Sequence, residues 1–283
     1  MKEDIPFQRS PSASRVRSAG LALLSTFLLA GCGDSLGVDG PQNVTVGFRT
    51  ADAAASAAPA ASVGPAGAPV QYDGTNGTLV IDQILMIVSE MELDSESGCD
   101  DDGRLDDDLF DDCEDFEADP QLVDLPLDGS PISVFSALIA PGVYDELDFE
   151  VEDIELDDID DDEKEGALAA LRDEVRALVP DWPDKASMYV TGTFQPEGGE
   201  PVAFRTFIEA EVEVELDLIP NLVIGNDGVA NRDLIIDIRP DLWFLDNQGF
   251  VRDLSQWDYD TTGQLLELEI EIENGFVDVE FDD

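Results

Sequence analysis

The chain has 283 residues, and its 66 acidic residues against 14 basic ones and no histidine give a formal net charge of -52. This charge excludes nucleic acid as a partner, because binding to phosphates requires a basic face. Without histidine the chain lacks the usual general base and the commonest transition-metal ligand, so any catalysis would depend on carboxylates. Leu, Ile, Val and Phe make up about 29% of the residues, above the roughly 20% typical of disordered chains, which predicts a folded core.

The first 31 residues are typical of a lipoprotein signal peptide. Basic residues precede an apolar run over 21–30 that is too short to cross a bilayer. The run ends in Leu29-Ala30-Gly31-Cys32, which resembles the lipobox of bacterial lipoproteins, where the cysteine is acylated and the signal is removed before it. An ordinary secretory signal that ends at a cysteine is the alternative. We expect lipidation at Cys32 and a protein held at the bacterial cell envelope, with Gly33 favouring the outer membrane.

Two further cysteines fit export to an oxidising compartment. Cys99 and Cys113 form an even pair, for which a disulfide is the expected state. The bond would close a 15-residue segment and contribute about 3 kcal/mol to stability in the loop-entropy model. Two unpaired thiols in a mobile loop are the alternative.

The next segment, 32–71, combines the lipidated N-terminus with a short predicted strand and a linker. The strand covers Asn43 to Thr50, and an Ala, Ser, Gly and Pro-rich stretch follows it to Pro69. Because this linker is longer than most loops inside a domain, the strand either docks on the domain from a distance or belongs to the tether.

Residues 72–254 are predicted to form a β-sandwich domain with an acidic insertion at 94–119. Between Leu79 and Leu93 the apolar residues change parity twice, which indicates bulges or a bend. Strict alternation of apolar and acidic residues predicts strands around 147–152 and from Val202 to Leu218, each with one buried and one wet face. Residues 188–194 form a further predicted strand, joined to the one at Val202 by a Gly-Gly hairpin turn.

One amphipathic helix and a C-terminal hairpin complete the expected fold. Glu163 to Leu178 has a capping-box-like start at Asp162, an apolar stripe and a terminating Pro180. In residues 255–283, the dipeptide Asn274-Gly275 predicts a type I′ turn that would pair two acidic strands. The predicted fold class is therefore mainly β, an antiparallel β-sandwich with a single helix and a C-terminal β-hairpin.

From Gly74 to about Leu254 the chain resembles a family of uncharacterised bacterial envelope lipoproteins. The motifs that carry the resemblance lie in predicted strands and turns: Leu79-Val80-Ile81-Asp82, Ser89 to Leu93, Val123 to Leu127, Ala140 to Asp145, Ala186-Ser187-Met188 with Gly192-Thr193-Phe194, and Arg239 to Phe244. This resemblance implies a transthyretin-like or immunoglobulin-like sandwich at the envelope. It transfers no catalytic residue, because the family has none established.

The acidic insertion is a candidate calcium site, since calcium prefers six to eight oxygen ligands. The expected ligands are the closely spaced carboxylates around Gly103: Asp100, Asp102, Asp106, Asp108, Asp111 and Asp112. The spacing does not match an EF-hand, because Gly98 occupies its first position. A solvated hairpin tip with diffuse counterions is the alternative. A second acidic stretch, 157–162, is more typical of a solvated segment ending in a helix cap.

Enzymatic function has little support in the sequence. Paired carboxylates suit glycoside hydrolysis, but in so acidic a chain such pairs arise by chance, and none lies in a distinctly apolar setting. Trp182, Trp243 and Trp257 could form a sugar platform, although core or rim positions are the better expectation.

We therefore expect no catalytic residues and a lipid-anchored binding or surface-interaction module, stabilised by calcium, with the membrane and divalent cations as partners and any protein or glycan partner unknown. Acidity as an adaptation to high salt, without a specific metal site, is the second hypothesis, and a carboxylate-based glycoside-active enzyme is the third.

Overall fold

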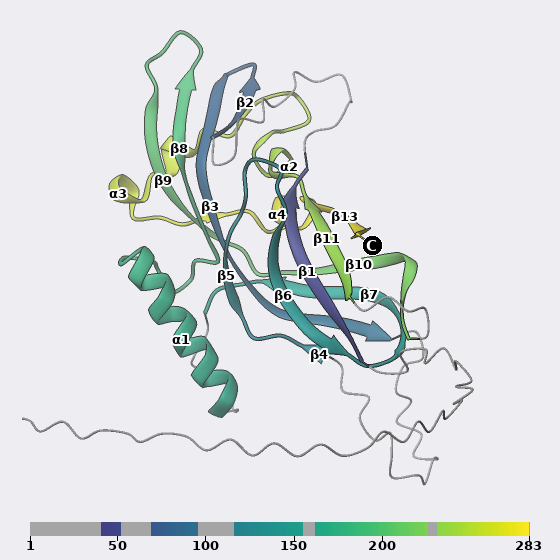
Figure 1. Ribbon diagram of the computed structural model, residues 1–283. Coiled ribbons are helices and arrows are strands. Elements are labelled where there is room, and N and C mark those ends of the chain that lie inside the picture. The colour runs from purple at the N-terminus through teal and green to yellow at the C-terminus, as the bar shows by residue number, and fades with distance from the viewer. Residues whose placement is uncertain (1–40, 52–68, 96–115, 155–161, 226–230, 283) are drawn as a thin grey trace, which may run out of the picture. The chain divides into compact units, whose positions relative to one another are not determined.

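The computed structural model describes residues 41–51, 69–95, 116–154, 162–225 and 231–282 (Figure 1). Every described residue belongs to one compact unit, 37–283. This unit is mainly β and contains two sheets.

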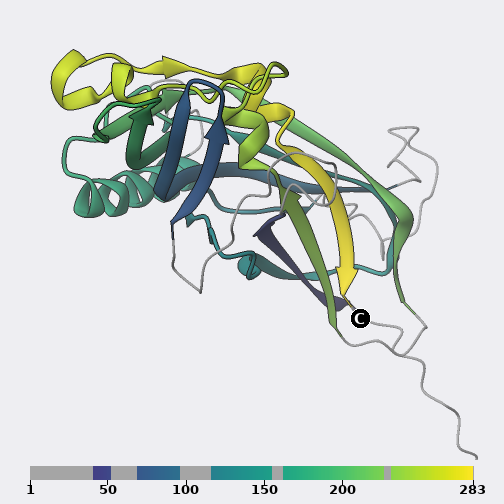
Figure 2. The ribbon, with the colours of Figure 1, turned by 90° about the horizontal axis from the view of Figure 1, so that it is seen from above.

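The smaller sheet has four strands in the order β13-β11-β1-β6. Their bounds are β1 Gln42–Thr50, β6 Ile132–Ile139, β11 Asn231–Ile238 and β13 Phe276–Asp282. Figure 2 shows β1, β11 and β13 in one layer. The early strand, for which the sequence left docking or tethering open, is an interior strand of this sheet, antiparallel to β6 and parallel to β11.

The larger sheet follows the order β10-β7-β3-β8-β9-β12, with three short strands also paired to β3. The main strands are β3 Gly77–Ser95, β7 Gly142–Val151, β8 Met188–Pro196, β9 Val202–Glu209, β10 Val212–Ile224 and β12 Leu266–Glu267. The three partners of β3 are β2 Val70–Gly74, β4 Phe116–Glu117 and β5 Gln121–Asp124. The predicted hairpin between β8 and β9 is confirmed.

The core lies between the two sheets, as expected for a sandwich. Phe48 of β1 packs against Phe149 of β7 with ring centroids 5.6 Å apart, and Phe276 of β13 meets Phe149 edge-on at 5.0 Å. Each of these side chains is almost completely buried. The alternation seen in the sequence produces this arrangement, because from Glu146 to Val151 the odd positions of β7 point into the sandwich and the even positions point out.

The predicted amphipathic helix is confirmed as α1, Asp162–Leu178. Its stripe of Leu171 and Val175 packs with Leu85 and Ile87 of β3 and Phe207 of β9 in a second apolar cluster. The short helical elements are α2 Pro240–Phe244, η1 Leu254–Trp257, α3 Tyr259–Thr262 and α4 Glu269–Glu273. None of the helices in the described part of the chain has the length and hydropathy that a membrane crossing requires.

The two parity changes predicted in β3 correspond to two irregularities. The register with β8 shifts between Ile81 and Gln83, and the register with β7 shifts between Ser89 and Glu92. Glu90, within the second shift, has a φ of 46°. Each bulge shifts the alternation of β3 by one residue, so that the apolar residues on both sides of it stay on the core face. The residues that reach the main core in this way are Leu79, Ile81, Ile84, Met86, Val88, Met91 and Leu93.

Two sequence predictions need correction: the length of one strand in the large sheet, and the purely antiparallel pairing of the strands. The single strand expected from Val202 to Leu218 is divided at Ala210 and Glu211 into β9 and β10, which pair with different neighbours. Alternation reports which face is buried and cannot detect a change of partner strand. The sandwich is also mixed rather than purely antiparallel, since β1–β11 and β9–β12 are parallel pairs.

The predicted C-terminal hairpin at Asn274-Gly275 is wrong. Glu269–Glu273 is a short helix, α4, and β13 pairs with β11 instead of with the preceding segment. Ile272 is buried beneath this turn, while Ile270 remains exposed. Gly275 is needed for a different reason, because a Cβ there would lie 1.7 Å from Nε1 of the buried Trp243.

Candidate functional site: an acidic ladder on three strands

The candidate site lies on the outer face of the large sheet, where β10, β7 and β3 are neighbours. From Glu146 to Glu150 the even positions of β7 carry carboxylates, and from Glu213 to Asp217 the odd positions of β10 do the same. Their alternating partners fill the core, which leaves every acid on the outer side. We call this set the acidic ladder; its members are Glu92, Asp94, Glu146, Asp148, Glu150, Glu213, Glu215 and Asp217.

The strand register places like charges directly opposite one another. Between β7 and β10 the facing pairs are Glu146 with Asp217, Asp148 with Glu215, and Glu150 with Glu213. Between β7 and β3 the facing pairs are Glu146 with Asp94, and Asp148 with Glu92. Directly opposed like charges destabilise a sheet, so the ladder is a site where positive charge or protons would be stabilising.

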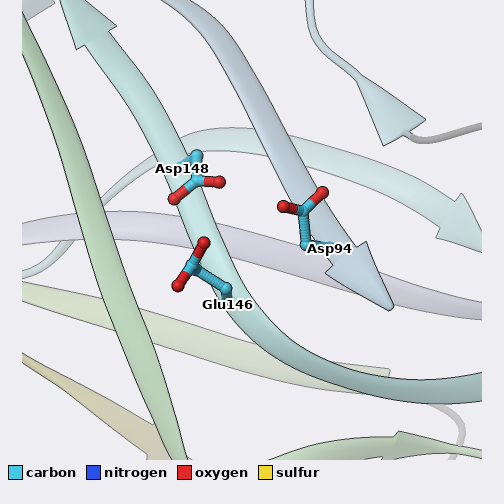
Figure 3. A group of neighbouring side chains, drawn as sticks. All are labelled: Asp94, Glu146 and Asp148. Carbon is cyan, nitrogen blue, oxygen red and sulfur yellow. The ribbon is translucent and has the colours of Figure 1, made fainter. Parts of the chain in front are cut away.

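The closest group is formed by Asp94, Glu146 and Asp148 (Figure 3). One carboxylate oxygen from each lies within 4.8 Å of the others, and all three residues are half-buried. Oδ1 of Asp148 is buried and has no hydrogen-bond partner among the described residues. The group therefore offers converging oxygen atoms of the kind that calcium and magnesium prefer.

The pKa values of the ladder reflect this crowding. Burial, followed by the charges of Glu146 and Asp94, raises the pKa of Asp148 to about 7. The pKa of Glu150 is also raised to about 7, by burial and then by the neighbouring Glu152 and Glu90. The pKa of Glu146 is raised, mainly by burial and then by Glu215. Near neutral pH the ladder can therefore take up protons as well as cations.

A hollow of about 340 Å³ continues the ladder beyond Glu150. Its lining is almost entirely acidic: Glu150, Glu152, Asp153, Glu211, Val212 and Glu213. Ser89 of β3, itself buried, donates a hydrogen bond of 2.6 Å to Oε1 of Glu152 and so fixes one wall.

The predicted calcium ligands and the predicted disulfide lie outside the described residues. This applies to all six aspartates from Asp100 to Asp112, to Cys99 and Cys113, and to the lipidation site Cys32. The ladder was not among the sites predicted from the sequence. The alternation around 147–152 and 209–217 was visible, but which strands are neighbours is a long-range property that alternation does not encode.

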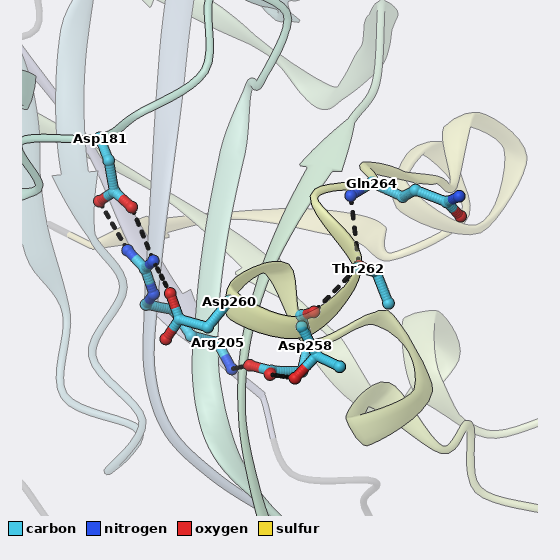
Figure 4. Close-up of polar contacts among 7 residues, drawn as sticks. Asp181, Arg205, Asp258, Asp260, Thr262 and Gln264 are labelled. Atoms are coloured by element: carbon cyan, nitrogen blue, oxygen red, sulfur yellow. Dashed lines mark hydrogen bonds and ion pairs between the residues drawn. The ribbon is translucent and has the colours of Figure 1, made fainter.

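A second polar cluster, centred on Arg205 of β9, has a structural role. Arg205 donates two hydrogen bonds to the carboxylate of Asp181, at 2.6 and 2.7 Å, and also pairs with Asp260 of α3 (Figure 4). Asp258 accepts a bond from the backbone of Arg205 at 3.2 Å and from Thr261 at 2.6 Å. The guanidinium also lies over the ring of Phe207, 5.5 Å from its centroid. Through these contacts Arg205 holds the C-terminal segment on β9, although its buried Nε has no hydrogen-bond partner among the described residues.

The tryptophans occupy core and rim positions, which was expected from the sequence in preference to a sugar-binding platform. Trp182 and Trp243 are buried, and each indole N–H donates to a backbone carbonyl, of Ala186 and Ile272 respectively. Trp257 is partly buried against the main core.

Comparisons with known proteins add little to this description. No protein-family model and no curated protein matches the chain. Among solved structures, MbnP from Methylosinus trichosporium is similar to it with 11% sequence identity and a TM-score of 0.33, over 74% of this chain and 79% of that chain. A likeness at this level carries no argument about function.

Proposed function

We propose that this protein is a non-enzymatic binding module of the bacterial cell envelope, anchored through lipid on Cys32, whose acidic ladder takes up divalent cations. The observation that carries the proposal is the register of β7 against β10 and β3, which sets carboxylates opposite carboxylates at successive positions. A sheet built in this way is stabilised by whatever neutralises it.

Calcium suits the group formed by Asp94, Glu146 and Asp148 because carboxylate oxygens are its preferred ligands and its coordination geometry is adaptable. Three carboxylates supply only part of a coordination shell of six to eight oxygens, and water can complete it on a half-exposed face. This favours reversible binding that responds to calcium concentration.

A binding role has more support than glycoside chemistry. None of the described residues that line the hollow beside Glu150 is aromatic, so these residues offer no stacking surface of the kind that apolar sugar faces use. Salt adaptation is the other alternative, in which the ladder attracts only a diffuse cloud of cations.

A calcium titration of the chain from residue 32 onward tests the proposal. At about pH 8 and low ionic strength, calcium should raise the melting temperature at concentrations at which an equal ionic strength of sodium chloride does not. Equal effects of the two salts would support the salt-adapted alternative and contradict a specific site.

Two variants locate the site. Asp94→Asn with Asp148→Asn should remove most of the calcium effect if the ladder binds the ion. Replacing Asp100, Asp102, Asp106, Asp108, Asp111 and Asp112 with asparagine should leave that effect in place. The reverse result would assign calcium to the insertion and overturn the ladder site. The control for the double variant is Glu197→Gln with Glu200→Gln, in the exposed turn between β8 and β9. It removes two charges, as Asp94→Asn with Asp148→Asn does.

A further inference from the structure

At one end of the sandwich long stretches of the chain carry no charge, in contrast to the rest of this acidic chain, although Arg232 and Asp233 of β11 and Asp282 of β13 lie at the same end. Three uncharged stretches occur in the described sequence near strand ends: Pro41 to Phe48, Gly129 to Tyr144, and Leu218 to Gly225. Gln42 pairs with Ile139, and its Nε2 donates to the carbonyl of Gly225 at 2.7 Å. The start of β1, the end of β6, the start of β7 and the end of β10 therefore meet at one place (Figure 1).

This end exposes large aliphatic side chains. Ile219 is 80% exposed, Leu138 70% and Val223 51%, and Ala140 and Pro141 in the link between β6 and β7 are exposed as well. Val223 lies directly opposite Val143, which is also exposed. We call this set, Leu138, Ala140, Pro141, Val143, Ile219 and Val223, the apolar end.

A bulge separates Val143 and Val223 of the apolar end from the acidic ladder on the outer face of the large sheet. The register of β10 against β7 shifts between Asp217 and Leu222. Beyond the shift, Leu222 and Ile224 point into the core and Val223 points out. The outer face of β10 thus changes from carboxylates to Val223, which lies beside Val143 of β7. The apolar contact surface is therefore separate from the charged one.

The chain enters the fold at this same end. Gln42 begins β1, and Cys32, the predicted lipidation site, lies nine residues before Pro41. Nine peptide units span at most about 30 Å. A lipid on Cys32 would therefore keep the apolar end within about that distance of the bilayer surface, whatever path the connecting residues take.

We propose that the apolar end docks on the lipid bilayer to which the chain is anchored, with Ile219 and Val223 entering the boundary between headgroups and acyl chains. The proposal rests on the lipid anchoring proposed above. A bilayer fits this surface because it accepts isolated aliphatic side chains without requiring complementary charge. The acidic insertion leaves the fold at Ser95, opposite Tyr144, so zwitterionic lipids suit the surface and anionic ones do not.

Brominated lipids, which quench a nearby indole, test the docking directly. The chain from residue 32 onward, with Cys32→Ser, is held on phosphatidylcholine vesicles through an N-terminal histidine tag and a nickel-chelating lipid, so that docking is measured whether or not Cys32 is acylated. Two matched pairs of variants are compared: Ile219→Trp with Ile270→Trp, and Val223→Trp with Val277→Trp. The members of each pair are of similar exposure, 80% and 69% in the first and 51% and 44% in the second.

Dibrominated phosphatidylcholine should quench the emission of Ile219→Trp and Val223→Trp about twofold more than that of the two control variants. Equal quenching within both pairs overturns the proposal. A blue shift in the emission of Ile219→Trp that depends on protein concentration in the absence of vesicles also overturns it, because this would show that a second copy of the chain covers the apolar end. Labelling of Cys32 with radioactive palmitate in cells tests the anchoring separately. Labelling with equal quenching would refute the docking alone, and quenching without labelling would refute the anchor alone.

Discussion

Asp148 of β7 lies directly opposite Glu215 of β10, the edge strand of the large sheet, whose outer face carries carboxylates on three neighbouring strands. The pairing is unfavourable when both groups are ionised, since opposed like charges destabilise a sheet. Protons and cations therefore act on the same positions and compete there.

The stability of the protein should fall as the pH is raised from about 5.5 to about 8 in calcium-free buffer of low ionic strength. The pKa of Asp148 rises from 3.8 to about 7 on folding, so the folded chain binds a proton there that the unfolded chain has released. Stability gained this way is fully present below the unfolded pKa and is lost as the pH passes about 7. Calorimetry across this range measures the slope, and a melting temperature that rises toward pH 8 would contradict the crowding of the ladder.

Replacing Asp148 with asparagine should stabilise the protein at about pH 8 and flatten its pH profile. The neutral amide removes a half-buried charge and its repulsion from Glu146 and Asp94. For a domain of this size, each kcal/mol gained raises the melting temperature by about 2–4 °C. Glu200→Gln, an exposed change of the same charge, should leave both the melting temperature and its pH dependence close to those of the parent. Equal shifts in the two variants would show that only net charge matters.

Replacing Arg205 with lysine should destabilise the protein by about 1–2 kcal/mol. Lysine keeps the charge but cannot make the bidentate contact with Asp181 while also reaching Asp260. Arg176 of α1 forms an exposed ion pair with Asp184, and Arg176→Lys should change the stability by less than about 0.5 kcal/mol. Urea denaturation of both variants measures the difference. Similar values would mean that the Arg205 cluster contributes no more than a surface ion pair.

Two glycine-to-alanine substitutions should have opposite effects. In Gly275→Ala the new methyl group would overlap the indole of Trp243, which is 1% exposed, so we expect a loss of about 1–3 kcal/mol. In Gly166→Ala, at an exposed position of α1, no described atom beyond the adjacent residues and the helix's own backbone lies within 4 Å of the added Cβ, and the gain in helix propensity should be about 0.5–1 kcal/mol. Thermal denaturation tests both. A neutral Gly275→Ala would show that the Trp243 side chain can move aside.

Structural features that depend on residues close together in the chain could be predicted from the sequence. The helix at 162–178, the turn between β8 and β9, and the bulges of β3 all follow from local patterns of capping residues, glycines and parity changes. The same alternation showed that β7 and β10 each have an acidic face. These signals are local because backbone geometry relates residues two, three or four positions apart.

The pairing of each strand with its neighbours depended on the tertiary structure. Asn274-Gly275 is a strong hairpin signal, yet α4 forms before it and β13 pairs with β11, because burying Ile272 and Phe276 against the core outweighs the local turn preference. The acidic ladder has the same origin. The sequence by itself determined that the chain is acidic, mainly β and amphipathic along its strands. Only the tertiary structure brought Asp94 to Glu146 and Asp148, since no local pattern specifies which distant strands share a register.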